Sequence, residues 1–317
     1  MAKSPERAIR FRRLILVPFL LTILILLAVR GASANVNVQY PSSVGIGKPF
    51  VIRLTSSVPL TKAEAVWQGR TTSLAVTVWN EHYIALGLLG AQVGKVKTGD
   101  HRLTLRLYND SLTSEHSLPI KITPVQYKED RLTLPEKMVN PPSSELKRIE
   151  EERKLVGAAL ATMSIDRFWA LPIVRPVQGI VTSPYGRRRI LNGKAGSPHG
   201  GVDFRAATDT PVKAALPGRV VLAGDHYFAG KSVYVDSGGG VISMYFHLNS
   251  ISVKQGDTVK SGQIVGKSGS TGRSTGPHLH FGLSLSGQAV DSEPLFSSTS
   301  ANLLDKSSFI KLALKWQ

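Results

Sequence analysis

The sequence predicts a mainly β protein, with an N-terminal β-sandwich, a helical linker and a C-terminal antiparallel β domain. Three observations support this fold class. Apolar residues alternate with polar ones in short runs before residue 128, a single helical period follows, and a glycine-dense, valine-rich region without helical period begins near residue 168. The length of 317 residues is sufficient for two domains with separate cores.

Residues 1–34 have the pattern of an export segment. Basic residues precede an apolar run, residues 14–29, and small residues end the segment at Ala34. We expect either a signal peptide cleaved after Ala34 or an uncleaved anchor in the inner membrane. The run is short for a membrane span and contains Pro18, which favours cleavage, whereas Arg30 beside the cleavage point argues against it. Both alternatives place the rest of the chain in the periplasm or cell envelope.

The charge and cysteine content narrow the function classes. Residues 1–34 hold six basic residues and one acidic residue, so their removal lowers the formal net charge from +17 to +12. For an exported protein this charge predicts contact with anionic envelope polymers and excludes nucleic acid as the partner. The chain has no cysteine, which excludes disulfides, thiolate metal sites and a cysteine nucleophile. Any metal ion must therefore be held by histidine, aspartate or glutamate.

Residues 35–127 are predicted to form the β-sandwich. Leu103, Leu105 and Leu107 alternate with polar residues and lie on one face of a strand, which is bounded by turn-forming residues. About seven such runs suggest a small sandwich. Further runs include residues 36–40, 50–54, 75–79 and 83–88. His82, His101 and His116 fall here without metal-like spacing, and we expect them to be ordinary strand or surface residues.

A linker with a helix, residues 128–167, is predicted to follow. Prolines mark its start, and apolar residues recur at helical spacing between residues 144 and 163, after serines that can cap the helix. The acidic run 150–152 is expected to face solvent. The C-terminal domain, residues 168–298, contains several valine-rich strands, and residues 299–317 form a tail.

Two histidines close together point to a metal site in the C-terminal domain. In a strand, His278 and His280 lie on one face while Leu279 and Phe281 lie on the other, so both imidazoles reach the same place. On a helix the same spacing would separate the two rings. One histidine of such a pair can ligate a metal while its neighbour faces an open coordination position.

The segment HGGVD at 199–203 supplies further ligands. An extended strand would hold His199 and Asp203 about 13 Å apart, and we expect Gly200 and Gly201 to turn the backbone and bring them together. With a second histidine they make three nitrogen and oxygen ligands, the number that a catalytic zinc ion requires beside one open position for water. His247 lies at the end of another strand, whereas His226, in a loop, is expected to be a bystander.

From about residue 172 to 296 the chain resembles the lysostaphin/LytM-type zinc metallopeptidases. The matching stretches are GIVTSPYGR at 179–187, SPHGGVDF at 197–204, TPVKA at 210–214, YFHL at 245–248, GDTVKSGQ at 256–263 and GSTGRSTGPHLHF at 269–281. More weakly, the β domain and helix before this region resemble those of exported members from Gram-negative bacteria. The resemblance implies that peptidoglycan peptide stems are the substrate and that the N-terminal domain or linker shades the active site.

Carried onto this sequence, the resemblance makes His199, Asp203 and His280 the ligands of Zn²⁺. His247 and His278 become the catalytic pair that handles the attacking water and the transition state. The leading hypothesis is an exported zinc endopeptidase that cleaves peptidoglycan cross-links. The alternatives are a carboxypeptidase, a peptidase for another glycine-rich protein, and a non-catalytic envelope-binding or amidase-activating module of the same fold. The basic run 187–189 could bind phosphate or carboxylate groups, but we expect a solvated loop.

Overall fold

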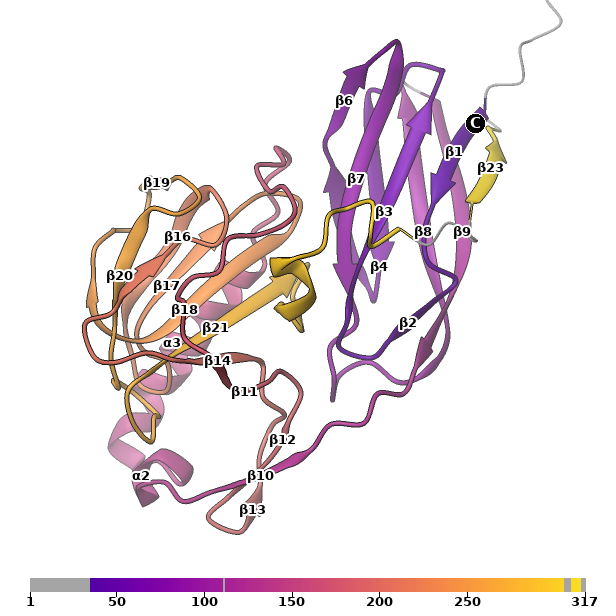
Figure 1. The fold of residues 1–317 in the computed structure, drawn as a ribbon. Helices are drawn as coiled ribbons and strands as arrows, with labels where there is room; N and C mark the ends of the chain where they lie inside the picture. The colour runs from indigo at the N-terminus through magenta and orange to yellow at the C-terminus, as the bar shows by residue number, and fades with distance from the viewer. Residues whose placement is uncertain (1–34, 111, 305–308, 315–317) are drawn as a thin grey trace, which may run out of the picture. The chain divides into compact units, whose positions relative to one another are not determined.

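Two five-stranded sheets form the N-terminal sandwich in a computed structural model, which describes residues 35–110, 112–304 and 309–314 (Figure 1). One sheet has the order β23-β1-β3-β7-β6 and the other the order β2-β9-β8-β4-β5. The strands are β1 Asn35–Gln39, β2 Ser43–Gly45, β3 Pro49–Ser56, β4 Lys62–Trp67, β5 Arg70–Leu74, β6 Val76–Trp79, β7 His82–Gly90, β8 Gly99–Asn109, β9 Leu112–Thr123 and β23 Phe309–Ala313. The export segment predicted for residues 1–34 lies outside the described residues.

The alternating sequence pattern correctly predicts which side chains fill the sandwich. Leu103, Leu105 and Leu107 of β8 are fully buried, while the residues between them reach the surface. The strand β23 is an addition that the sequence analysis did not predict, because it treated residues 299–317 as a tail. Residues 309–313 pair antiparallel with β1, so the C-terminal segment returns to the N-terminal sheet.

The linker contains a short strand and two helices: β10 Glu129–Leu132, α2 Glu136–Val139 and α3 Ser143–Leu160. The predicted helix is confirmed, although its N-terminus follows Pro142 and has no side-chain cap. The expectation of a wholly solvated acidic run is wrong at Glu152. Its carboxylate accepts hydrogen bonds from the backbone N–H of Tyr227 and from Arg148, and it thereby ties α3 to the C-terminal domain.

A larger antiparallel sheet, the C-terminal sheet, has the order β11-β14-β21-β18-β17-β16-β19, and β15, β20 and β22 pair along its side. Its strands are β11 Val181–Ser183, β14 Gly201–Arg205, β15 Pro211–Lys213, β16 Gly218–His226, β17 Gly230–Asp236, β18 Val241–Ile251, β19 Thr258–Val259, β20 Ile264–Ser268, β21 His278–Leu285 and β22 Gln288–Val290. The 3₁₀ helix η1 Glu293–Phe296 follows. Figure 1 shows α3 lying against this sheet, which it contacts at β16.

A third, small sheet extends the linker toward the C-terminal sheet. Strand β10 pairs in parallel with β12 Arg188–Leu191, which pairs with β13 Lys194–Ala195. Residues 35–317 form one compact unit, and Val51 and Leu88 of the sandwich belong to the same apolar core as the C-terminal sheet. Lys48 of the sandwich also forms a 2.5 Å ion pair with Asp291.

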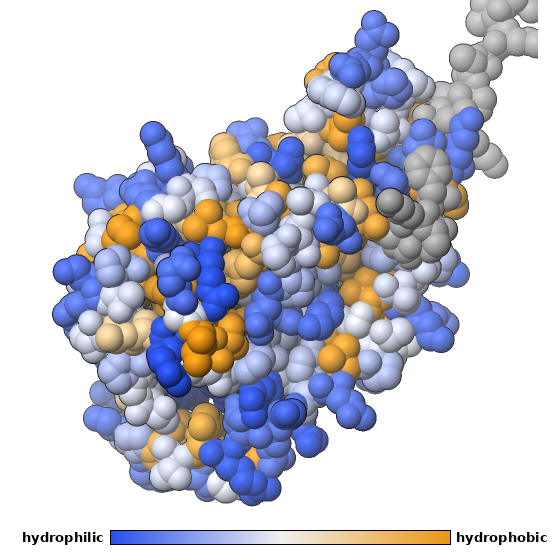
Figure 2. Space-filling model, viewed as in Figure 1, coloured by the Kyte–Doolittle hydropathy of each residue, from blue (hydrophilic) through white to orange (hydrophobic). Residues whose placement is uncertain are grey.

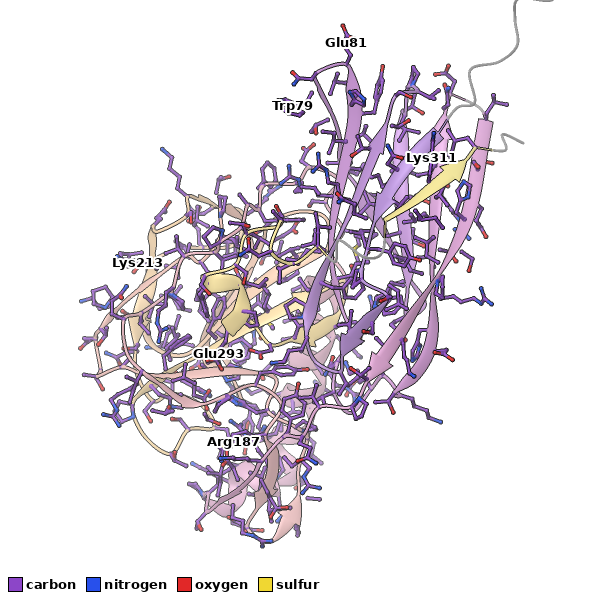
Figure 3. All side chains as sticks on the ribbon, turned by 45° about the vertical axis from the view of Figure 1, so that its right-hand side comes forward. Trp79, Glu81, Arg187, Lys213, Glu293 and Lys311 are labelled. Atoms are coloured by element: carbon purple, nitrogen blue, oxygen red, sulfur yellow. The ribbon has the colours of Figure 1, made fainter. Side chains whose placement is uncertain are left out.

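The surface of this unit is mixed in polarity. On the face shown in Figure 2, apolar residues form small patches separated by hydrophilic ones. Figure 3 shows Trp79 and Glu81 at the tip of the β6–β7 hairpin, where Trp79 is exposed. In the part of the chain that the structure describes, no helix has the length and apolar character needed to cross a membrane.

Candidate metal centre

Three side chains predicted as ligands converge where β14 meets β21. Asp203 of β14 is the register partner of His280 of β21, and His199 lies just before β14. His199 Nε2 is 3.0 Å from Asp203 Oδ1 and 3.0 Å from His280 Nδ1, and the last two atoms are 2.8 Å apart. All three residues are buried. Antiparallel pairing thus brings together residues that lie far apart in the sequence.

The donor atoms of this cluster fit a metal ion. His199 Nδ1 lies 2.9 Å from the carbonyl oxygen of Pro184, which can only accept a hydrogen bond, so Nδ1 carries the proton of the neutral ring. His199 Nε2 therefore points a lone pair at the carboxylate of Asp203, and a cation is needed between them. A tetrahedral ion with bonds of about 2.0–2.2 Å separates its ligands by roughly 3.4 Å, close to the spacing found here.

The glycines of the HGGVD segment have a different role from the one predicted. Neither Gly200 nor Gly201 adopts a left-handed backbone conformation. A Cβ on Gly201 would lie 2.4 Å from the carbonyl oxygen of Phe281 and 2.7 Å from Nε2 of His280. A Cβ on Gly200 would meet nothing within 4 Å. Gly201 is therefore required for the close approach of His280 to β14, and a glycine turn is not what joins His199 to Asp203.

His247 and His278 lie beside the three ligands, and both rings hold Nδ1 in a hydrogen bond to a backbone carbonyl. His278 Nδ1 donates to the carbonyl oxygen of Gly276 at 2.8 Å, and His247 Nδ1 donates to that of Thr271 at 2.8 Å. Each neutral ring thus keeps a free lone pair on Nε2. The two ring centroids are 4.9 Å apart, and His278 Nε2 is 3.8 Å from Asp203 Oδ1.

The backbone of His247 is unusual for a strand residue. Its φ of 60° lies in the left-handed region, which non-glycine residues rarely adopt, and its N–H donates to the carbonyl oxygen of Ala229 in the turn between β16 and β17. Strand β18 continues past this residue to Ile251, whereas the sequence analysis placed His247 at a strand end. The irregular conformation directs the ring toward His278 and His280.

Burial determines the charge state of these side chains. Desolvation lowers the pKa of His247 to about 3, with a further contribution from the neighbouring His280 and His278, and it lowers the pKa of His280 to about 4. Burial alone would raise the pKa of Asp203, but its contacts with the His199 and His280 rings hold it well below its usual range. Near neutral pH His247 and His280 are therefore neutral and Asp203 is ionised, and a neutral imidazole and an ionised carboxylate are the forms that bind metal ions.

Arg189 is a site residue that the sequence analysis missed. Its Nη2 lies 3.2 Å from Asp203 Oδ2, so the oxygen that faces the histidines, Oδ1, is left for the metal. Arg187 pairs with Asp130 of the linker at 2.7 Å, and Figure 3 shows it where the chain leads into β12. The expected solvated loop is correct only for Arg188, whose side chain is 71% exposed against 21% for Arg189. The spacing of the three arginines was the available signal for this difference, because residues 187 and 189 of an extended chain point to one side and residue 188 to the other.

Two adjoining cavities, of about 420 and 480 Å³, form a cleft over the metal centre. Both are lined by Arg189, Leu191, His247, Arg273 and His280. Linker residues form part of the walls, namely Asp130, Leu132, Leu134 and Val139. The cleft is thus bounded partly by the C-terminal sheet and partly by the segment that precedes it.

The other four histidines stay apart from this centre. His82, His101 and His116 lie on sandwich strands, as expected. His226 is the last residue of β16 and not a loop residue, and its Nδ1 contacts Ser232 Oγ at 2.7 Å. Among residues 35–110, 112–304 and 309–314, His199, Asp203 and His280 form the one group with metal-binding spacing.

Residues 197–292 match the family described as Peptidase family M23. Over 95 residues the chain is 43% identical to peptidoglycan DD-endopeptidase ShyA of Vibrio cholerae, a match that covers 30% of this chain and 22% of that protein. Over 99 residues it is 50% identical to lysostaphin of Staphylococcus simulans, covering 31% of this chain and 20% of lysostaphin. These matches span only about a fifth of the relatives' length.

A longer match exists among solved structures. A crystal structure assigned to peptidase M23 from Pseudomonas aeruginosa is 31% identical to this chain, with a TM-score of 0.59. The match covers 78% of this chain and 92% of the other. It therefore extends well beyond the residues of the family match and includes more than the C-terminal sheet.

Proposed function

Because this chain belongs to peptidase family M23, we propose that it is an exported, zinc-dependent endopeptidase that hydrolyses peptide bonds in peptidoglycan cross-links. One observation carries the proposal. Three ligand atoms, from His199, Asp203 and His280, lie within 3.0 Å of one another below a cleft, beside two further imidazoles with free Nε2 lone pairs. Relatives named as peptidoglycan and glycyl-glycine endopeptidases support the substrate class.

The ligand set supports zinc. Two imidazole nitrogens and one carboxylate oxygen are three protein ligands, which leaves a fourth position of a tetrahedral ion open for substrate or water. Bound zinc would supply Lewis acidity, which polarises the scissile carbonyl and makes a water molecule easier to deprotonate. Arg189 holds Asp203 Oδ2, and Pro184 holds the Nδ1 proton of His199, so the ligand atoms are oriented in advance.

His247 and His278 are placed to handle protons in the reaction. Their Nδ1 protons are held by the carbonyls of Thr271 and Gly276, so each ring exchanges protons through Nε2 on the side facing the cleft. A neutral Nε2 can accept a proton from the attacking water, and the resulting N–H can donate to the oxyanion or to the leaving amine. Burial of His247 excludes bulk water from one side of this pair.

The proposed location is the periplasm or cell envelope. The basic and apolar pattern of residues 1–34 and the residual charge of +12 support export toward anionic polymers. An inner-membrane anchor at residues 14–29 is the alternative to cleavage.

The decisive experiment combines zinc stoichiometry with digestion of peptidoglycan sacculi. Purified protein from residue 35 onward, loaded with zinc, is expected to bind one zinc ion and to release muropeptide fragments, and His280→Ala to lose both properties. Exposed His82, on a sandwich strand, provides the control: His82→Ala should behave as the wild type. Mass spectrometry of the products separates endopeptidase from carboxypeptidase activity. Stoichiometric zinc without any digestion would instead support a non-catalytic envelope module.

A further inference from the structure

We propose that Arg273, next to Arg189, forms a carboxylate-binding subsite in the cleft, so that the substrate is a peptide with a free carboxylate close to the scissile bond. This inference rests on the proposed peptidase function and specifies its substrate. The carboxylate is either the end of a peptide stem or an acidic side chain, because both have the same chemistry.

Arg273 is held in place by its surroundings. It belongs to the loop between β20 and β21, and its backbone N–H donates to the carbonyl oxygen of Phe228 at 2.8 Å. Its guanidinium lies over the ring of Phe228, 4.7 Å from the centroid. The preceding Gly272 has a φ of 70°, and a Cβ there would lie 2.3 Å from the backbone nitrogen of Gly230. The loop is thus tightly packed against residues 228–230, which limits the positions open to the guanidinium.

The charge of Arg273 is not balanced by any carboxylate among the described residues. Within the described parts of the chain, no carboxylate forms an ion pair with Arg273, whereas Arg189 has Asp203 and Arg187 has Asp130. Burial lowers the pKa of Arg273, and the positive charge of Arg189 lowers it further. A partly buried guanidinium beside a like charge is unfavourable unless an anion joins them. The planar guanidinium matches a carboxylate with two parallel hydrogen bonds.

Arg273 lies in the cleft over the metal centre. Arg273 and Arg189 line both cavities of the cleft, together with His247 and His280. The loop that carries Arg273 leads directly into His278 at the start of β21, so a ligand anchored by the guanidinium lies next to the proton-handling histidines. The negative charge of Asp203 cannot serve Arg273, since one of its oxygens faces the histidines and the other contacts Arg189. The carboxylate of a bound peptide would supply the counter-charge for Arg273.

The test measures binding separately from cleavage. Three synthetic cross-linked stem peptides serve as probes: one with all carboxylates free, one with its terminal carboxylates amidated and one with its side-chain carboxylates amidated. Binding is measured by calorimetry on the zinc-free protein, which does not turn the probes over. We expect one amidation to weaken wild-type binding about 10- to 100-fold, the value of a charge-assisted hydrogen-bonded pair. Which amidated peptide binds weakly identifies the source of the carboxylate.

Variants then assign the effect to Arg273. Arg273→Met is expected to bind all three peptides equally, and Arg273→Lys to keep part of the preference. Arg219→Met, which removes the same charge from an exposed position on β16, should keep the wild-type ratio. The proposal is overturned if the wild type binds the three peptides equally or not at all, or if Arg273→Met keeps the preference. The relative affinities of the wild-type protein for the three peptides are measured without any variant. They test the subsite even if Arg273→Met does not fold.

Cleavage of the same peptides by the zinc-loaded protein keeps the two proposals apart. Cleavage of all three probes at equal efficiency leaves the peptidase function standing and refutes the subsite. Selective binding without any cleavage supports the subsite and refutes the peptidase function.

Discussion

Replacing Gly201 with alanine tests whether the metal centre depends on the close approach of β14 to β21. The added Cβ would lie 2.4 Å from the Phe281 carbonyl oxygen and 2.7 Å from His280 Nε2, about 1 Å inside normal contact. The carbonyl belongs to a paired strand and cannot rotate away, so either the strands separate or the His280 ring moves. Overpacking of this kind costs about 1–3 kcal/mol. At about 3 °C per kcal/mol, the melting temperature should fall by roughly 6 °C.

The same displacement should weaken metal binding. Displacement of the His280 ring is expected to lower the affinity for zinc by about 10- to 100-fold. Loss of the contacts that support a ligand has an effect of this size in other protein metal sites. Affinity is measured by competition with a chromophoric chelator, and stability by calorimetry of the zinc-free protein. Gly200→Ala is the matched control, because its Cβ meets nothing within 4 Å, and it should melt at or slightly above the wild-type temperature. Wild-type stability and zinc affinity in Gly201→Ala would refute the steric argument.

Two further predictions concern pH and the linker. The zinc-free protein should lose stability as pH falls from about 6.5 toward 4, since an unfolded histidine takes up a proton near 6.5 whereas the folded pKa values of His247 and His280 are about 3 and 4. Each histidine should lower the free energy of unfolding, measured by urea titration, by about 1.4 kcal/mol per pH unit. If the free energy of unfolding of His247→Gln fell as steeply with pH as that of the wild type, this account would be contradicted. Asp130→Ala removes the ion pair with Arg187 that holds β10 at the cleft. The pair is worth about 1 kcal/mol, so the linker should be displaced from the cleft about five times more often. The rate of sacculus digestion should therefore rise relative to the rate of cleavage of a short peptide. The neighbouring Glu129→Ala is the control, and an unchanged ratio of the two substrates for Asp130→Ala would show that the linker does not shade the site.

The strands of this protein could be predicted because their pattern is local. The alternation of Leu103, Leu105 and Leu107 with polar residues can be read without knowing any tertiary contact, and burial of one strand face follows from it. The strand β23 could not be predicted in the same way. Its stability depends on pairing with β1 at the opposite end of the chain, and short apolar runs near a terminus do not show whether such a partner is in reach.

The candidate ligands were also predictable, but their arrangement was explained wrongly. Residue types and the strand spacing of His278 and His280 selected side chains that the structure brings together, whereas their convergence was expected from a turn at Gly200 and Gly201. The structure shows instead that strand register places Asp203 opposite His280 and that Gly201 makes room for the ring. Register is a property of two strands together, so one strand alone could not reveal it.

The mainly β composition and the residues able to bind a metal ion follow from the sequence alone, because periodicity and side-chain chemistry are carried by each segment. The folded chain was needed to show which ring nitrogen of each histidine faces the centre, how Arg189 orients Asp203, and that Arg273 lies in the cleft with no ion-pair partner among the described residues. Those features depend on carbonyls, carboxylates and cations from separate segments meeting at distances of a few ångströms, and only the folded backbone sets these distances.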